Sequence, residues 1–200
     1  ACGHPPYVET SPVNNPIKKA GYNLVFNDEF NSSQIENKWD NCYPWGRNLY
    51  GNEELEWYSR GNNYQFVNGM ISKDGKATIV DGVLKLVAKK ESVTEKLIDW
   101  LDENQILDDG KPNKRTFNYT SGMIFSKYSY HYGYFEIKCK IPKGKGLWPA
   151  FWLYGGGSCN DEIDVFEFEG ASPNIIHTTY HGNCDRSAQE FQIIQSAYAD

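Results

Sequence analysis

Three carboxylates between Glu162 and Glu167 carry the clearest chemical signal in this 200-residue chain. The segment reads Glu-Ile-Asp-Val-Phe-Glu, and its β-branched and aromatic residues favour a β-strand. Alternation along a strand places Glu162 and Asp164 on one face. Glu167 joins them only if one extra residue, at Val165 or Phe166, forms a β-bulge. Two carboxylates with a third acid between them suit glycoside hydrolysis, in which one acts as the nucleophile and the other as the general acid.

The residues after this strand predict a partner for it. Residues 170–174 read Gly-Ala-Ser-Pro-Asn, a turn sequence, and residues 175–181 then return as an antiparallel strand. Counting back across the bulge sets two histidines and a threonine on the same face as the acids. The expected pairs are Glu167 with His177, Asp164 with Thr179, and Glu162 with His181. The same register sets Cys159 opposite Cys184, so we expect a disulfide bond there.

Several other segments match one known family together with the acid motif. They are Asn27–Phe30, Asn52–Tyr58, Tyr119–Gly122 and Gly144–Trp152. In content, order and approximate spacing these segments resemble glycoside hydrolase family 16, in its laminarinase-like branch with a bulged Glu-x-Asp-x-x-Glu motif. The resemblance covers roughly residues 20 to 200 and implies a β-jelly-roll sandwich, of the concanavalin A-like type, with a concave substrate cleft.

The resemblance also assigns roles to the acids. Glu162 matches the nucleophile of a retaining endo-acting glycoside hydrolase, and Glu167 matches its acid/base. Asp164 is expected to share a proton with Glu162 and keep the two acid roles distinct. Further residues match positions that bind the sugar chain or lie on the face of the acids. They are Trp148, Trp152, His181, His177, Trp45, Asn52 and Glu53.

The substrate implied by the resemblance is a β-linked polysaccharide, with β-1,3-glucan or mixed-linkage β-glucan favoured. Met123 argues against this choice, because many β-1,3-glucan-cleaving relatives carry an arginine there. A marine galactan hydrolase of the agarase, porphyranase or carrageenase type is therefore an alternative, and so is a non-catalytic carbohydrate-binding protein of the same fold. The two glutamates favour an enzyme over the binding protein. Hydrolysis and transglycosylation would use the same residues.

The rest of the chain is expected to be a β-sandwich with one insertion. Short strand-like segments dominate, including an alternating segment at residues 134–141, and Asp81–Gly82 is a tight hairpin signal. Cys139 falls on the apolar face of that alternating segment, which predicts a buried thiol. Residues 92–104 combine a capping box with apolar residues at helical spacing, so we expect an inserted helix and loop over residues 90–116.

The N-terminal segment is expected to lie outside the catalytic domain. Residues 1–18 are polar and proline-containing, which predicts a tether, and residues 19–200 form the family 16 domain. Ala1-Cys2-Gly3 looks like a bacterial lipoprotein cleavage site, with Cys2 as a lipid anchor and a secreted or cell-surface location. Domains of the family continue past the position of Asp200, so we expect this domain to lack its last strands.

Charge and composition limit the partners. The formal charge of −6 argues against nucleic acid, and the 15% aromatic content suits sugar stacking. The sequence contains no apolar run long enough to span a membrane, and we expect a monomer. The resemblance implies no cofactor for catalysis. It does imply a structural Ca²⁺ held by Glu29 and the carbonyl of Gly82, because such oxygen ligands suit that ion.

Overall fold

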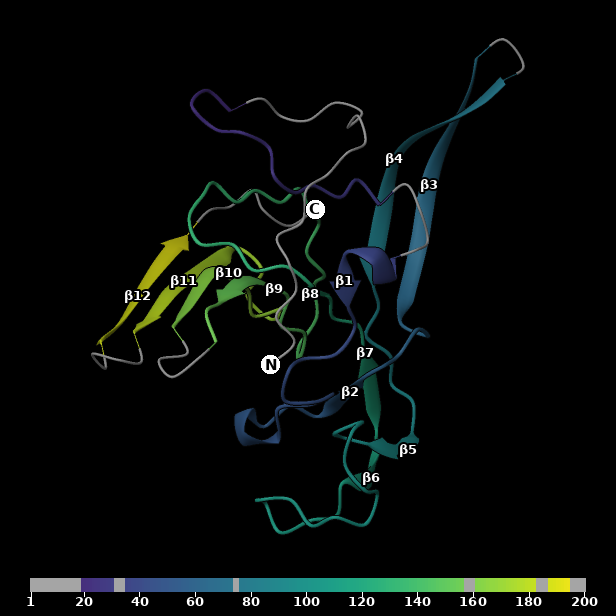
Figure 1. The fold of residues 1–200 in the computed structure, drawn as a ribbon, viewed down its shortest axis with the longest axis vertical. Coiled ribbons are helices and arrows are strands. Elements are labelled where there is room, and N and C mark those ends of the chain that lie inside the picture. The colour runs from purple at the N-terminus through teal and green to yellow at the C-terminus, as the bar shows by residue number, and fades with distance from the viewer. Residues whose placement is uncertain (1–18, 31–34, 74–75, 157–160, 183–186, 195–200) are drawn as a thin grey trace. The chain divides into compact units, whose positions relative to one another are not determined.

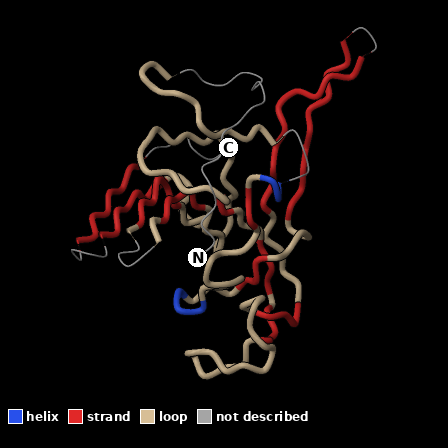
Figure 2. The backbone as a smooth tube through the Cα atoms, viewed as in Figure 1, coloured by secondary structure: helices blue, strands red, loops and turns tan. Residues whose placement is uncertain are grey.

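The computed structural model of the chain describes residues 19–30, 35–73, 76–156, 161–182 and 187–194. The chain forms two compact units, one ending at Tyr134 and the other beginning at Phe135. Strands dominate both units (Figure 1). Among the described residues, helix is limited to two 3₁₀ turns, η1 (Ile35–Asn37) and η2 (Tyr50–Asn52), drawn blue in Figure 2. The expected all-β class is therefore confirmed.

The N-terminal unit contains four two-stranded ladders in its described part. The ladder of β2 and β7 is parallel and the other three are antiparallel. The ladders pair β1 (Trp39–Asp40) with β8 (Phe125–Ser126), β2 (Glu56–Tyr58) with β7 (Tyr119–Ser121), β3 (Tyr64–Lys73) with β4 (Lys76–Leu86), and β5 (Val93–Lys96) with β6 (Lys114–Phe117).

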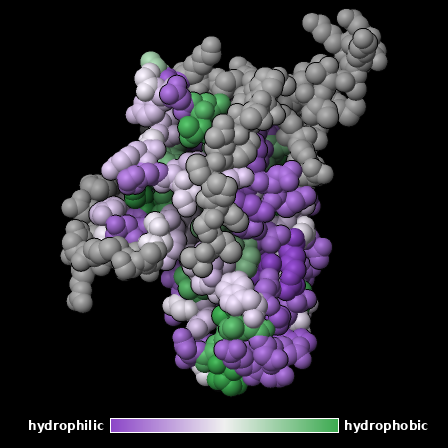
Figure 3. Space-filling view, in the orientation of Figure 1, coloured by the Kyte–Doolittle hydropathy of each residue, from purple (hydrophilic) through white to green (hydrophobic). Residues whose placement is uncertain are grey.

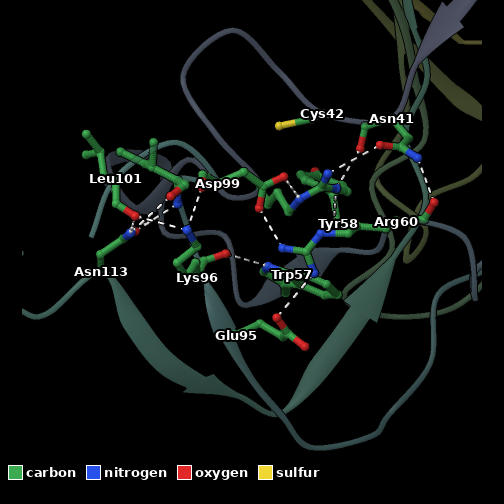
Figure 4. A network of polar contacts seen from close by, with 12 residues as sticks. Asn41, Cys42, Trp57, Tyr58, Arg60, Glu95, Lys96, Asp99, Leu101 and Asn113 are labelled. Atoms are coloured by element: carbon green, nitrogen blue, oxygen red, sulfur yellow. Dashed lines mark hydrogen bonds and ion pairs between the residues drawn. The ribbon is translucent and has the colours of Figure 1, made fainter. Parts of the chain in front are cut away.

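A small apolar core and a partly buried ion pair stabilise the region of β2 and β5. Trp57, Leu97, Leu107 and Phe117 form the core, and Leu97 is fully buried. Next to them, the Arg47 guanidinium donates from Nε to Asp99 Oδ2 over 2.6 Å (Figure 4). It also donates from one terminal nitrogen to two backbone carbonyls, each at 3.0 Å. Burying a cation in this way is favourable only because every part of it that the fold covers meets an acceptor.

The C-terminal unit contains a four-stranded antiparallel sheet, the part of the fold that positions the predicted site. Its order is β12-β11-β10-β9, so chain neighbours lie side by side (Figure 1). Adjacent pairing of this kind needs only turns between strands. The strands are β9 (Ala150–Tyr154), β10 (Glu162–Glu167), β11 (Ile175–Gly182) and β12 (Ser187–Ile194).

The predicted helix within residues 92–104 is wrong. Residues 93–96 form β5, and its partner β6 lies about twenty residues later in the chain. Val93 and Leu97 are four residues apart, a spacing that places two side chains on one face of a helix or of a strand. A cross-strand pair of β-branched residues favours the strand over the helix: Thr94 Oγ1 lies 2.9 Å from Thr116 Oγ1 across the ladder. Sequence reading missed that distant partner.

The hairpin predicted at Asp81–Gly82 is also wrong. β4 runs unbroken through both residues, and the β3–β4 ladder begins at the pair Lys73 and Lys76. Asn68 pairs with Gly82 and Gly69 with Val80, which leaves Asp81 as an extra residue in β4. A bulge and a tight turn both recruit aspartate and glycine, so the dipeptide alone does not separate them.

No strand is assigned at residues 134–141, where the sequence alternates, and Cys139 is exposed rather than buried. Alternation marks a segment able to form a strand, but a strand also needs a ladder partner.

Figure 3 shows hydrophilic side chains over much of the visible surface, with hydrophobic ones in small groups between them. None of the helices in the described residues is long and apolar enough to cross a membrane.

Candidate active site

The β-bulge in β10 brings the three predicted acids onto one face. Asp164 pairs with Thr179 and Glu167 with His177, so three steps along β10 match two along β11. The one-residue excess is the bulge predicted from parity. Against β9, the shift falls between Asp164 and Phe166. The predicted pairs of Glu162 with His181, Asp164 with Thr179, and Glu167 with His177 are all confirmed.

The register arranges the site in three rows that run across β9, β10 and β11. Directly paired residues of neighbouring antiparallel strands point to the same face. Each row therefore carries one acid with a neighbour on either side. The rows are Tyr154, Glu162 and His181; Trp152, Asp164 and Thr179; and Ala150, Glu167 and His177.

Asp164 lies at the centre of a short proton-sharing chain. Its side chain is only 2% exposed, and its Oδ2 lies 3.0 Å from Nε2 of His181. On its other side it hydrogen-bonds to the carboxyl of Glu162. A carboxylate buried this deeply needs such partners, since an unpaired buried charge is costly. Asp164 can therefore hold a proton together with Glu162 while His181 fixes its orientation.

Glu162 is the acid whose protonation the site perturbs most clearly. Burial, the negative charge of Asp164 and the hydrogen bond between the two carboxyls raise the pKa of Glu162 to about 7, while nearby His181 acts in the opposite direction. Two acids that interact this closely release their protons as a pair. The arrangement can store one proton between the two carboxyls near neutral pH.

Glu167 has a partner on the other side of the site. Nε1 of Trp148 donates a hydrogen bond to Glu167 Oε1 over 2.8 Å. The Trp148 side chain is otherwise open, and the residue is 60% exposed. An exposed indole beside an acid can offer its ring face to a sugar. The site thus combines a proton-sharing carboxyl pair, a second carboxyl and an open aromatic ring.

Comparison with known proteins gives this arrangement a family. The model of glycosyl hydrolases family 16 matches residues 65–200, which include every acid of the site. The chain belongs to glycosyl hydrolase family 16. It is 35% identical to the endo-1,3-1,4-beta-glycanase EglC of Rhizobium meliloti, over 80% of the chain and 32% of that relative. It is 32% identical to a glucan endo-1,3-beta-glucosidase of Cryptopygus antarcticus, over 79% of the chain and 50% of that enzyme.

Solved structures support the same assignment. The endo-beta-1,3-glucanase of Pyrococcus furiosus matches with a TM-score of 0.54 and 29% identity, over 87% of this chain and 62% of that one. The laminarinase catalytic domain of Thermotoga maritima matches with a TM-score of 0.53 and 25% identity, over 88% and 63%. The predicted family 16 jelly-roll fold is confirmed by these matches. The chain spans a third to a half of the length of the curated relatives described above.

Most of the predicted sugar-binding residues of the family 16 sheet share the face of the acids. Trp152 and His177 lie in the rows of Asp164 and Glu167, and His181 contacts Asp164. Sequence reading missed Tyr154, which pairs with Glu162 and packs edge-on against Trp152. The alternation from Trp148 to Trp152 would have found it if extended by one step.

The other three predicted sugar-binding residues belong to the N-terminal unit, so their part in the site stays a prediction. Trp45 is half-buried and stacks on Tyr43, with ring centroids 4.6 Å apart. Asn52 ends η2 and is exposed. Glu53 follows with a positive φ of 59°, a conformation that a non-glycine residue adopts at a cost and that is often found near functional sites.

The expected substrate cleft also stays a prediction, because the C-terminal sheet does not test it. A hollow of about 230 Å³ lies in the N-terminal unit, between Trp39, Arg60 and Tyr64, and none of the predicted site residues lines it. Ile163 points to the face of β10 opposite the acids and is 45% exposed, and its partner Tyr180 is 40% exposed. Alternation correctly turned Ile163 away from the acids, but burial needs a second layer over that face.

The structure bears on the predicted calcium site but not on the predicted disulfide bond. Among the described residues, Glu162, Asp164 and His181 could hold a metal ion, since their ligand atoms lie within 4.8 Å of one another. The hydrogen bonds between them explain this proximity without an ion. No comparable group of three acidic, histidine or cysteine side chains forms around Glu29 in the described part of the chain. Cys159 and Cys184 lie outside the described residues, so their disulfide stays a prediction.

Proposed function

We propose that this chain is the catalytic part of a retaining, endo-acting glycoside hydrolase that cleaves a β-glucan. The observation that carries the proposal is the single face shared by Glu162, Asp164 and Glu167, which depends on the bulge. A retaining enzyme needs one ionised and one protonated carboxyl on either side of the glycosidic bond. Family membership supports the same reaction class.

The proposed reaction has two steps. The Glu162 carboxylate attacks the anomeric carbon, while Glu167 gives its proton to the departing glycosidic oxygen. The sugar is then bound covalently to Glu162. In the second step Glu167 takes a proton from water, the water oxygen attacks the same carbon, and the Glu162 carboxylate leaves. Asp164 raises the proton affinity of Glu162 through its charge and its hydrogen bond, and His181 keeps Asp164 in place.

A neutral glucan suits this chain better than a sulfated galactan. The relatives named above are called a 1,3-1,4-beta-glycanase and a 1,3-beta-glucosidase. A sulfated chain needs exposed cations, and the sequence offers Arg47, Lys127 and Arg186 as candidates near the cleft. Arg47 is 4% exposed and its guanidinium is already bound to Asp99 and backbone carbonyls, and Arg186 lies outside the described residues. Nζ of Lys127 lies 3.6 Å from Oδ1 of Asp40, with which it forms an ion pair. The negative net charge acts in the same direction.

A substrate screen tests the reaction and the substrate together. The full-length protein is incubated with laminarin, mixed-linkage glucan, agarose, porphyran and carrageenan, and the products are sized. We expect oligosaccharides from one or both glucans, with the β-configuration retained in the first product seen by proton NMR. Cleavage of a galactan without action on either glucan would reject the substrate, and an inverted first product would reject the mechanism.

A variant of the nucleophile tests the role of Glu162. We expect Glu162→Gln to lower kcat by about 10⁴-fold, or about 5.5 kcal/mol of transition-state stabilisation, while the oligosaccharide still binds. Glu169→Gln is the matched control, because Glu169 is an exposed glutamate two residues beyond β10. Calorimetric binding and single-turnover assays separate the two effects, and near-normal turnover in Glu162→Gln would reject the assignment.

We also propose a location and two further properties for the whole protein. Cys2 is the lipid anchor of a secreted or cell-surface monomer, and mass spectrometry of the N-terminal peptide should find an acyl chain there. Light scattering should give the mass of one chain. A structural Ca²⁺ at Glu29 and the Gly82 carbonyl should raise the melting temperature, and Glu29→Gln should remove that increase.

A further inference from the structure

Trp148 combines exposure with one fixed polar contact. Its ring is open to solvent, yet its one polar atom donates to Oε1 of Glu167 over 2.8 Å. An exposed side chain normally loses entropy when it is held in one position. The hydrogen bond therefore forms at little entropic cost only if the backbone already places the indole beside the acid.

Backbone hydrogen bonds on both sides of Trp148 provide that placement. Gly170 N–H donates to the Leu147 carbonyl over 2.7 Å, and Phe168 N–H donates to the Pro149 carbonyl over 3.1 Å. The segment is tied once more where Gly144 N–H donates to the Gly170 carbonyl over 2.9 Å. Trp148 is thus held, from residues on either side, against the chain that leaves β10.

Gly170 makes this close approach possible. A Cβ atom at this position would lie 2.2 Å from the Gly144 carbonyl oxygen and 2.9 Å from Leu147 Cβ. Both distances are far below van der Waals contact, and one of the atoms is backbone, which cannot turn aside. The segment before Trp148 therefore reaches Glu167 only because residue 170 has no side chain.

We propose that Trp148 is a positioning residue that determines which oxygen of Glu167 transfers the proton. An indole N–H can donate a hydrogen bond but cannot accept one. With Trp148 bound at Oε1, the proton of the neutral acid resides on Oε2, which is left to face the glycosidic oxygen. This inference rests on the proposed acid/base role of Glu167 and adds a function for Trp148 besides sugar stacking.

The hydrogen bond also matches the charge changes of the reaction. In the first step the Oε2 proton moves to the glycosidic oxygen as the bond to the anomeric carbon breaks, and Glu167 becomes a carboxylate. The Trp148 bond is then charge-assisted and stronger. In the second step Oε2 takes a proton from water, and the bond at Oε1 weakens again. The indole favours the state in which the proton has been given away.

Trp148→Phe tests the proposal because it removes the N–H and keeps an aromatic ring. Trp100→Phe is the matched control, since Trp100 is also 60% exposed and has no place in the proposed site. Aryl glycosides are made from the oligosaccharide that the enzyme releases in the substrate screen. Loss of a hydrogen bond to a charged group predicts about a tenfold slower cleavage of the phenyl glycoside in Trp148→Phe.

The leaving group distinguishes proton delivery from sugar binding. The dinitrophenyl glycoside needs no acid to depart, so we expect Trp148→Phe to slow the first-turnover release of phenol about tenfold more than that of dinitrophenol. A variant that has merely lost stacking would raise KM for both glycosides equally, and that result would overturn the proposal. So would equal first-turnover rates for the phenyl glycoside in Trp148→Phe and Trp100→Phe.

The pH profile gives a second test of the same variant. A donor at Oε1 stabilises the ionised acid, so its loss should move the alkaline limb of kcat/KM to higher pH. In the described part of the sheet, the other titratable groups on the face of Glu167 are Tyr154 on β9, Glu162 and Asp164 on β10, and His177 and His181 on β11, all unchanged in Trp148→Phe. The paired residue of β9 is Ala150, which does not titrate. An unmoved limb would count against the proposal.

A measurement without substrate separates this inference from the proposed function. In protein labelled with ¹⁵N-tryptophan, the Trp148 indole signal is identified by its loss in Trp148→Phe. We expect that signal to shift with pH as Glu167 ionises, and to stop shifting in Glu167→Gln. A signal that ignores Glu167 would overturn the positioning role even in an active enzyme. Full activity of Glu167→Gln on the polysaccharide would instead reject the acid/base assignment.

Discussion

Asp164 connects the chemistry of the site to its protonation. It is 2% exposed and hydrogen-bonds to both His181 and Glu162. As the proposed nucleophile, Glu162 must be ionised to attack, yet burial and Asp164 raise its pKa to about 7. The kcat/KM of the free enzyme should therefore fall as the pH drops below neutrality, because the fraction of ionised Glu162 falls with it.

Asp164→Asn should move that acid limb to lower pH. Asparagine keeps an acceptor for His181 but carries no charge, so the ionised form of Glu162 becomes easier to make and the pKa of Glu162 falls. The measurement is kcat/KM from about pH 4 to about pH 9, around the usual glutamate range. Asp108→Asn, at an exposed acid of the N-terminal unit, is the control. A limb that stays in place or rises would contradict the proton-sharing account.

At the scale of elements, the approach of residues 144–149 to the end of β10 depends on Gly170. Gly170→Ala should lower the free energy of unfolding by about 1 to 3 kcal/mol, as overpacking in a filled site does. It should also lower kcat, because Trp148 is displaced from Glu167. Urea unfolding and steady-state kinetics measure both effects.

Gly61→Ala is the control for this change. A Cβ at Gly61 would meet nothing within 4 Å, so its stability should change little. If the two variants were equally stable and equally active, the close approach at Gly170 would have no energetic importance.

The ion pair of Arg47 with Asp99 is a second feature whose loss should measurably lower the free energy of unfolding. Asp99 accepts from Arg47 and from Arg60, each over 2.6 Å, and both guanidiniums lie over the Trp57 ring, 5.7 and 5.1 Å from its centroid. Figure 4 shows Arg60, Asp99 and Trp57 together. Asp99→Asn leaves the Arg47 charge buried without its counter-ion, which should cost about 3 kcal/mol of unfolding free energy.

Glu103→Gln provides the comparison for Asp99→Asn. Glu103 pairs with Lys114 over 2.7 Å, but both side chains are about half exposed. Such exposed pairs contribute at most about 1 kcal/mol. Equal shifts of the urea midpoint in the two variants would show that burial of Arg47 does not determine the cost.

For the whole molecule, the charge of −6 and the paired state of Arg47 argue for a neutral substrate. Binding of a neutral glucan should then depend little on salt. We expect KM to change by less than about twofold between about 0.01 M and 1 M NaCl, over which the Debye length falls from about 30 Å to about 3 Å. A KM that rises steeply with salt would point instead to a sulfated chain held by cations.

The sequence by itself determined the acids, their common face and their cross-strand partners. Strand parity, the one-residue correction at Val165–Phe166 and a short turn were sufficient, because each depends only on neighbouring residues. The pairings of Glu162 with His181 and of Glu167 with His177 therefore agree with the structure. Family motifs spread over most of the chain added the fold.

Only the tertiary structure decided features that depend on distant partners. Residues 93–96 became a strand because β6 pairs with them, and Asp81 became a bulge residue because β3 continues past it. The contact of Trp148 with Glu167 depends on Gly170 and on the backbone before it. Strand pairing, burial and close approach all join residues that are remote in the chain, and local sequence patterns carry little information about such contacts.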